Sequence, residues 1–315
     1  MVAKSREHSL NRFFLHSFGP NRNLITTDHG AWAVLNSEEL QQLNERSIGK
    51  ELAGKLEDCG VIVTEKNRQK IDERFGKRFD FLFNGTCLHI INPTLRCNQS
   101  CVYCYANSKS ASGSPEQDLS RETAKKIVDF IFQSPAKDIT IEFQGGEPLL
   151  RFDLIKFIVG KVKEKNRGNG KKIQWNVVTN LTLMDEQKAK FFEKNRFCLS
   201  TSLDGPRKAH EKNRPFTEGQ SYEQVIAWVK TLKRDYRLGH VGLLPTITKY
   251  NLHYAKELVE LYASLGMQDI RPVPLRRIGK AAENWGEIGC TGKQYLRFWK
   301  GVVEECIKRT RQGQF

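Results

Sequence analysis

The sequence predicts an α/β fold, in which helices cover a parallel sheet, with a small α+β unit in front of it. From Leu88 onward, short apolar segments alternate with longer amphipathic ones, and this alternation is typical of βα units. The preceding segments follow another order, and a highly charged connector, Glu65 to Arg78, separates the two parts. We therefore expect an N-terminal domain with its connector at 1–78, a core at 79–290 and a C-terminal helix at 291–315.

The N-terminal part combines short strand-like segments with two helix-like ones. Asn36 and Glu39 have the spacing of a capping box, which predicts a helix that runs through Leu43. Ser47–Asp58 is expected to form a second helix, and Gly60 can supply the left-handed residue that ends it. The expected strands are Phe13–Leu15, Ala31–Leu35 and Val61–Val63.

The core contains six strand-like segments, each followed by a segment with helical periodicity. The expected strands are Leu88–Asn92, Ile139–Phe143, Ile173–Thr179, Phe197–Ser202, Val241–Ile247 and Ile270–Leu275. The expected helices lie at about 120–131, 154–162, 186–193, 225–232, 254–265 and 295–307. In parallel α/β folds the working groups lie on loops that follow the strands, so those loops are the place to look for a site.

The composition excludes some classes of protein. The chain of 315 residues carries 51 basic and 36 acidic side chains, a net charge of +15, which could attract nucleic acid or an acidic peptide. The basic residues are spread along helix faces, and no RNA-binding motif accompanies them, so we expect a solvated surface and no nucleic acid partner. The apolar runs are too short to span a bilayer, and the N-terminus has no secretory pattern. We expect a cytoplasmic protein without a membrane partner.

Three cysteines follow the first core strand at a spacing that can turn their thiolates toward one centre. They are Cys97, Cys101 and Cys104. Thiolates are soft ligands that select iron–sulfur clusters, zinc or Cu(I). A cubane cluster has four irons, so three cysteines would leave one iron open to a small molecule. A zinc knuckle, or three free thiols, is the alternative.

Two further motifs accompany the cysteines in order, and together they resemble a known family. Gln144–Pro148 has the sequence QGGEP, and Ser202–Pro206 is followed by His210 and Arg214. The cysteine loop with these motifs resembles the radical S-adenosylmethionine (SAM) enzymes, in their peptide-modifying, sulfatase-maturase-like branch, over about Thr86 to Leu275. Within that branch the sequence most resembles the His-Xaa-Ser system maturases. With the six βα units, the resemblance implies a partial (β/α)6 TIM-like barrel that is open on one side.

The resemblance also implies cofactors and site residues. A [4Fe-4S] cluster would bind to the three cysteines, and S-adenosyl-L-methionine would chelate the open iron. Tyr103 would pack beside the adenine, Ser202 would contact the ribose, and Arg214 would pair with the SAM carboxylate, a task that suits a guanidinium fork. The methionyl part would lie on the motif at 145–147. The residues that would contact it are Gly145, Gly146 and Glu147, with the carboxylate of Glu147 accepting from the ammonium.

The implied reaction begins when a reduced cluster passes one electron to SAM. The resulting 5′-deoxyadenosyl radical would remove a hydrogen atom from a ribosomally made peptide or protein, with a reductant such as flavodoxin or ferredoxin as a partner. Gln144 occupies the position of a substrate-side glutamine in sulfatase maturases, although a capped strand end would explain it equally. The alternatives are a maturase that forms formylglycine and a non-catalytic metal-binding adaptor.

We expect structural roles for the remaining residues of interest. His210 is expected to be structural, and Asp204 could be a simple Asp-Gly turn residue. Cysteines in strand or helix settings are expected to be small buried apolar residues. These are Cys59, Cys87 and Cys198. Only Cys290 and Cys306 follow the last core strand, so we expect no auxiliary-cluster domain, and the N-terminal part could be a peptide-recognition unit or a packing extension.

Overall fold

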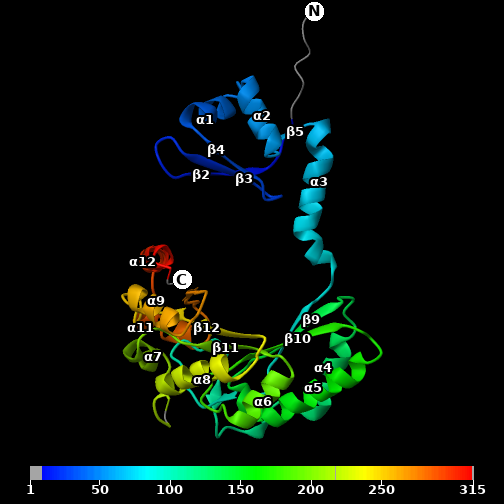
Figure 1. Cartoon of the computed structure of the whole chain (residues 1–315), viewed down its shortest axis with the longest axis vertical. Helices are drawn as coiled ribbons and strands as arrows, with labels where there is room; N and C mark the ends of the chain where they lie inside the picture. Colours follow the sequence, from blue (N-terminus) through cyan, green and yellow to red (C-terminus); the bar gives the residue numbers. More distant parts are fainter. Residues whose placement is uncertain (1–8, 217, 314–315) are drawn as a thin grey trace, which may run out of the picture. The chain divides into compact units, whose positions relative to one another are not determined.

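The computed structural model describes residues 9–216 and 218–313, and the chain forms two compact units (Figure 1). One unit ends at Gly85 and the other begins at Thr86. The charged segment that was predicted as a connector lies in the first unit. It forms the helix α3 (Glu65–Phe79), followed by the single turn η1 (Asp80–Phe83), and both belong to the first unit.

The first unit packs helices against a three-stranded antiparallel sheet of order β2-β3-β4. Its core is made of buried aliphatic residues such as Ile25, Leu35 and Leu56. The predicted capping box is present, because Asn36 and Glu39 exchange hydrogen bonds between side chain and backbone. The elements are β1 (Ser9–Leu10), β2 (Phe13–Ser17), β3 (Asn23–Thr27), β4 (Trp32–Leu35), α1 (Ser37–Asn44), α2 (Lys50–Asp58) and β5 (Ile62–Val63), which pairs with β1. The central strand β3 was not predicted.

The second unit is built on a five-stranded parallel sheet of order β12-β11-β10-β9-β6. The strands are β6 (Leu88–Ile91), β9 (Asp138–Phe143), β10 (Lys172–Val178), β11 (Cys198–Ser202) and β12 (His240–Leu244). The predicted sixth strand is reduced to β14 (Val273–Pro274), which pairs with β13 (Thr246–Ile247) in a separate two-stranded ladder. The sheet is thus parallel, as the alternation of segments predicted.

Helices cover one face of this sheet, and the residues of the other face are half-buried or exposed. Alternate residues such as Ile141, Phe143 and Trp175 are buried against the helices, and the rings of Phe143, Trp175 and Phe197 stack on one another. Figure 1 shows α4, α5, α6 and α8 along this side of the sheet. The intervening residues, including Glu142, face the opposite side, as the period of two in a strand requires.

Six helices of the second unit lie at the predicted positions, and three short ones, α7, α10 and α11, were not predicted. They are α4 (Arg121–Ile131), α5 (Phe152–Asn166), α6 (Glu186–Lys194), α7 (Arg207–Asn213), α8 (Ser221–Asp235), α9 (Ala255–Ser264), α10 (Lys280–Glu283), α11 (Trp285–Ile288) and α12 (Gly292–Arg311). Short elements complete it: β7 (Arg96–Cys97), β8 (Lys109–Ser110), η2 (Pro115–Gln117) and η3 (Pro148–Arg151). The unpredicted α7 carries His210 and ends beside Arg214. No helix within the described residues is long and apolar enough to cross a membrane.

Candidate functional site

The cysteine loop and the glycine pair lie against each other at the carboxyl ends of β6 and β9. The amide of Gly146 donates to the carbonyl of Thr94 at 2.9 Å, and that of Glu147 donates to the carbonyl of Arg96 at 2.8 Å. Gly145 has φ +118°, and a Cβ atom at Gly145 or Gly146 would lie 2.4 or 2.1 Å from those same carbonyl oxygens. The glycines are therefore required for the packing of the two loops, before any ligand is considered.

The three cysteines predicted to bind the cluster are half-buried, and none of them forms a disulfide. Burial raises the pKa of Cys97 to about 12, and burial also raises the pKa of Cys101. A bound metal would offset this cost by displacing the protons. Among the described residues, no three His, Cys, Asp or Glu side chains converge on a single ion. A cubane needs no such convergence, since each of its thiolates ligates a different iron, and three free cysteines on one loop fit that requirement.

Backbone hydrogen bonds from distant segments hold the cysteine loop in place. The amide of Val102 donates to the carbonyl of Asn213, and the amide of Lys280 donates to the carbonyl of Cys104, both at 3.0 Å. The side chain of Asn284 donates to the carbonyl of Val102 at 2.9 Å. The cysteines are thus presented by a loop whose polar backbone groups are paired on several sides, which limits how far the thiols can move.

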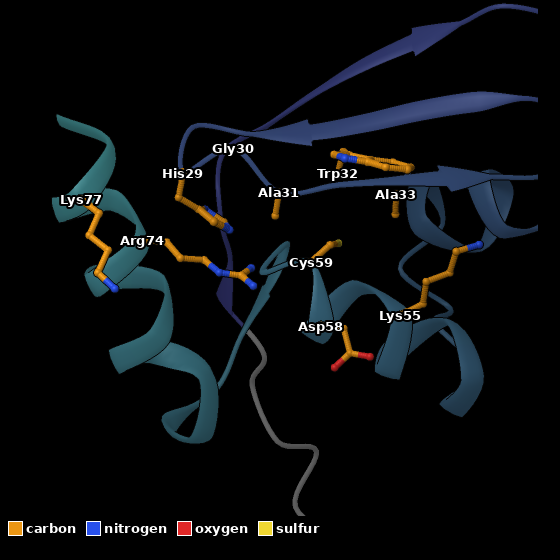
Figure 2. Close-up of a pocket in the computed structure, with 10 residues that line it drawn as sticks. All are labelled: His29, Gly30, Ala31, Trp32, Ala33, Lys55, Asp58, Cys59, Arg74 and Lys77. Atoms are coloured by element: carbon orange, nitrogen blue, oxygen red, sulfur yellow. The ribbon is translucent and has the colours of Figure 1, made fainter.

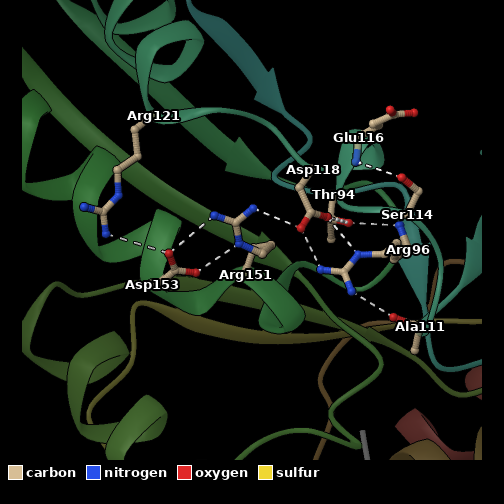
Figure 3. Close-up of polar contacts among 9 residues, drawn as sticks. All are labelled: Thr94, Arg96, Ala111, Ser114, Glu116, Asp118, Arg121, Arg151 and Asp153. Carbon is tan, nitrogen blue, oxygen red and sulfur yellow. Dashed lines mark hydrogen bonds and ion pairs between the residues drawn. The ribbon is translucent and has the colours of Figure 1, made fainter.

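A half-buried ion-pair network supports the base of the same loop (Figure 3). Asp118 accepts from Nε and Nη2 of Arg96 at 2.9 and 2.6 Å, and from Oγ1 of Thr94 at 2.5 Å. Arg151 lies 3.0 Å from the same carboxylate and also pairs with Asp153. Burial alone would raise the pKa of Asp118, but hydrogen bonds from Arg96, Thr94 and Arg151 hold it below its usual value. Because Arg96 precedes Cys97, this network fixes the start of the cysteine loop.

Glu147 is almost completely buried, and its carboxylate is engaged within the protein. It accepts from Oγ1 of Thr179 at 2.7 Å, from the amide of Asn180 at 2.7 Å and from the amide of Leu149 at 3.0 Å. Burial raises its pKa, while these hydrogen bonds act in the opposite direction. The side chain therefore ties the loop after β9 to the loop after β10. Its predicted contact with the SAM ammonium stays a prediction.

Arg214 and Tyr103, which were predicted to contact different parts of SAM, bond to each other, and a third residue joins them. Nη1 of Arg214 donates to the Tyr103 hydroxyl at 2.8 Å, and that hydroxyl donates to Asp204 at 2.5 Å. The other guanidinium nitrogen of Arg214 donates to Gln99 at 3.2 Å. Ser202 is half-buried at the end of β11, on the sheet face away from the helices. The structure thus brings three predicted cofactor residues to the carboxyl edge of the sheet, beside the cysteines.

Asp204 is a buried junction and not a simple turn residue. Its side chain is fully buried, and the carboxylate oxygen that Tyr103 does not contact accepts from the amide of Thr246 at 2.9 Å. The side chain of Asn251 donates to the backbone carbonyl of Asp204 at 2.9 Å. Burial raises the pKa of its carboxyl, against the opposing influence of Arg214 and Tyr103. Its position after a predicted strand was a signal for such a role, but its partners lie far away in the sequence.

Two of the expected structural assignments hold and two are wrong. His210 is fully buried, near Ser221 Oγ at 3.2 Å, and Cys59 is buried as expected. Cys87 is exposed, because it precedes β6 at the surface. Cys198 is only half-buried, because it begins β11 on the polar face of the sheet, where Gln174 donates to its sulfur at 3.2 Å.

Buried polar atoms beside the cysteines are left without partners in the protein. Among the described residues, Nε2 of Gln99 and Nδ2 of Asn213 have no hydrogen-bond acceptor. Gln99 lies between Cys97 and Cys101, and Asn213 precedes Arg214. An unpaired buried donor is costly, so Nε2 of Gln99 is available to a ligand that carries an acceptor oxygen. The side chain of Asn213 instead lies close to the Asp204 carboxyl and acts against the rise in the pKa of that carboxyl. SAM has a carboxylate and ribose hydroxyls, and the site therefore suits it chemically.

Known proteins with similar sequence or fold cover this same region. A protein of Methanocaldococcus jannaschii described as uncharacterized is 33% identical over 185 residues, which is 58% of this chain and 60% of that protein. A cysteine-type anaerobic sulfatase-maturating enzyme of Clostridium novyi is 28% identical over 189 residues, 58% of this chain and 48% of the enzyme. The chain thus spans about half to three fifths of the length of these relatives.

The fold comparison agrees with the sequence comparison. The structure described as native anSMEcpe with bound AdoMet superposes with a TM-score of 0.62 at 22% identity, and the match covers 72% of this chain and 61% of that one. This likeness confirms the predicted partial barrel. Residues 91–262, more than half of the 315, match the sequence pattern of the radical SAM superfamily. The chain therefore belongs to the radical SAM superfamily, whose enzymes use a [4Fe-4S] cluster and S-adenosylmethionine.

Proposed function

We propose that the chain is a radical SAM enzyme that removes a hydrogen atom from a peptide or protein substrate. The observation that carries this proposal is the junction of loops at one sheet edge, where Arg214 and Asp204 both bond to Tyr103 of the cysteine loop and Arg214 also bonds to Gln99. When bound, the cluster and SAM supply the radical that abstracts hydrogen. The chain's own residues bind and orient the cofactors and the substrate.

Each part of this edge has a distinct task in the proposal. The three cysteines hold the cluster through their thiolates. The guanidinium of Arg214, itself fixed by Tyr103 and Gln99, binds the SAM carboxylate. Ser202, on the same face, contacts the ribose, and the backbone of Gly145 and Gly146 meets the methionyl part where no side chain intervenes.

A peptide substrate is supported by the relatives and by the N-terminal unit. Several of the relatives are named anaerobic sulfatase-maturating enzymes. The N-terminal unit contains an open pocket of about 640 Å³, to which α3 contributes Arg74 and Lys77 and α2 contributes Lys55 and Asp58 (Figure 2). Lys55 is paired with Glu39 at 2.7 Å, so Arg74 and Lys77 are the two cations that face Asp58, and this balance favours a peptide segment with acidic residues. We propose that this pocket contributes to substrate recognition.

The proposal is tested by SAM cleavage under anaerobic conditions. Reconstituted protein with a strong reductant should produce 5′-deoxyadenosine, and alanine variants of the three cluster cysteines should lose both the iron–sulfur absorbance and the product. Cys290→Ala is the matched control, since Cys290 lies outside this loop, and it should retain both. A triple cysteine variant that keeps its full cluster would refute the site. Wild-type protein that holds a cluster but never cleaves SAM would favour the adaptor alternative.

The substrate is identified by mass spectrometry of candidate peptides co-expressed with the chain. A mass change that depends on Cys97, with flavodoxin or ferredoxin as electron donor, would establish peptide modification. We propose a reducing, cytoplasmic setting, because three free thiols must stay available to iron. Conversion of a cysteine or serine to formylglycine remains the second candidate, favoured by Gln144 and by the named relatives. A sulfatase-derived peptide that the chain leaves unmodified would exclude it.

A further inference from the structure

The face of the sheet away from the helices carries a polar row that the cofactor residues do not use. The register of the strands places Ile90, Glu142, Asn176, Cys198 and His240 side by side on β6, β9, β10, β11 and β12. All five belong to the alternating set that points away from the helix-covered core. The row lies on the strands whose carboxyl ends lead into the loops that hold the cysteines and Arg214.

Glu142 is the one member of this row with an oriented negative charge. Asn176 donates to its carboxylate at 3.3 Å, Gln144 also donates to it, and Tyr105 in turn donates to Gln144 at 2.7 Å. Every one of these neighbours is neutral. The chain of donors begins at Tyr105, next to Cys104, so it links the position of the carboxylate to the cysteine loop.

No cation of the described residues compensates this charge. Glu142 forms no ion pair there, although the chain has 51 basic residues, and the other acidic residue on this face of β9, Asp138, lies near Lys172 at 3.7 Å. His240 occupies the same row three strands away, which is about 14 Å at the usual strand spacing, too far for an ion pair. A half-buried carboxylate held by two neutral side chains, Asn176 and Gln144, retains its charge for an incoming cation.

An exposed apolar strip adjoins the carboxylate. Leu88 and Ile90 lie on the neighbouring edge strand β6, 47% and 53% exposed, and Ile90 is in register with Glu142. Lysine and arginine side chains commonly lay their methylene stems along apolar surface while the charged head reaches a polar partner. The strip and the carboxylate together have the chemistry that such a side chain requires.

We propose that Glu142 binds a lysine or arginine side chain of the peptide substrate, whose stem lies on Leu88 and Ile90. This inference rests on the proposed peptide-modifying function and deepens it. It makes Glu142 a specificity-determining residue, which orients the substrate beneath the cofactors without taking part in bond cleavage. Asn176 and Gln144 act through Glu142 as positioning residues.

The test measures binding of two small probes to the reconstituted chain. The probes are N-acetylarginine methylamide and its neutral counterpart N-acetylnorleucine methylamide, and saturation-transfer NMR gives their affinities. Wild-type protein should bind the arginine probe about tenfold more tightly than the norleucine probe. A hydrogen bond to a charged group contributes enough free energy to change the affinity by about that factor. Glu142→Gln should lose this preference while norleucine binding stays unchanged. Glu142→Asp, which keeps the charge, should retain a preference for arginine.

The matched control is Glu122→Gln, on the outer surface of α4, which should behave as the wild type does. Equal binding of the two probes to wild-type protein, or absence of binding, would overturn the proposal. So would an arginine preference that survives in Glu142→Gln. Because the binding measurement needs no SAM cleavage, these failures would leave the proposed function intact, and absence of 5′-deoxyadenosine would refute that function separately.

Discussion

Replacing Asp118 by alanine should destabilise the second unit and loosen the start of the cysteine loop. The carboxylate side chain is 9% exposed and accepts from Thr94, Arg96 and Arg151. Alanine removes all of these contacts at once, and it leaves two neighbouring guanidinium groups, 19% and 21% exposed, without their shared counter-charge. The variant thus removes only the acidic partner of a half-buried ion-pair network. This costs more stability than replacing both partners would, because the two arginines keep their charges.

The size of the effect follows from burial. Removing one partner of a buried pair costs about 3–5 kcal/mol. The two arginines keep some contact with water, and Arg96 still donates to the carbonyl of Ala111 at 2.8 Å, so we expect the lower end, about 3 kcal/mol. For a unit of this size, that corresponds to a fall in Tm of roughly 6–12 °C.

Urea and thermal unfolding of Asp118→Ala check this expectation. Glu122→Ala is the control, because its exposed i,i+4 pair with Lys126 should contribute only about 0.5 kcal/mol. The iron retained after anaerobic desalting should also fall in Asp118→Ala and not in the control, because Arg96 adjoins the first cluster cysteine. An Asp118→Ala variant as stable as the Glu122→Ala control would refute the reasoning.

Three further predictions concern SAM, iron and pH. Arg214→Ala and Glu147→Ala should weaken SAM binding while the cluster still assembles. Glu147→Ala should also lower stability, because three donors lose their acceptor. Unchanged SAM affinity of both variants in equilibrium dialysis would place the SAM pocket elsewhere. Anaerobic iron and sulfide analysis should give about four irons per chain, and a clean value near twice that would contradict a single cluster. Burial lowers the pKa of His210 to about 3, so its imidazole stays neutral in the folded state while the unfolded chain takes up a proton below pH about 6.5. Stability should therefore fall with decreasing pH, by about 1.4 kcal/mol per pH unit from this group; His210→Gln should show a shallower slope in urea midpoints between pH 7.5 and 5, and identical slopes would contradict the assignment.

The sequence was sufficient for the parallel sheet because the buried strands and helices differ in period. It was less informative where a strand is short and polar: β3 (Asn23–Thr27) lies in the middle of its sheet, yet only two of its residues are large and apolar. Cys198 was misplaced for a related reason. Cys198 shares one face of β11 with Ser200 and Ser202, at every second position. This period of two identifies the polar face of the strand more reliably than the residue type does.

The candidate site also contains features that the sequence alone could predict and features that it could not. Motifs that act locally, such as the cysteine spacing and the glycine pair, could be identified from neighbouring residues. The partner of Asp204 could not, because Tyr103 lies 101 positions earlier in the chain, and only the fold brings the two together. The same holds for Arg214 and Gln99, and for the row that contains Glu142, which exists only once the strands are in register.

The segment around α10 has a consequence for how the protein is made. Gly279, at φ +55°, lies so close to the cysteine loop that a Cβ atom would be 2.4 Å from the carbonyl of Cys104, and Lys280 and Asn284 bond to that loop. On a ribosome the cysteines emerge long before these residues do. The loop can acquire its final backbone pairing only after residue 284 has left the ribosome, so iron and sulfide can reach a rigid site only after that point. A nascent chain that stalls before α10 would expose its thiols to oxidation in an unfinished loop.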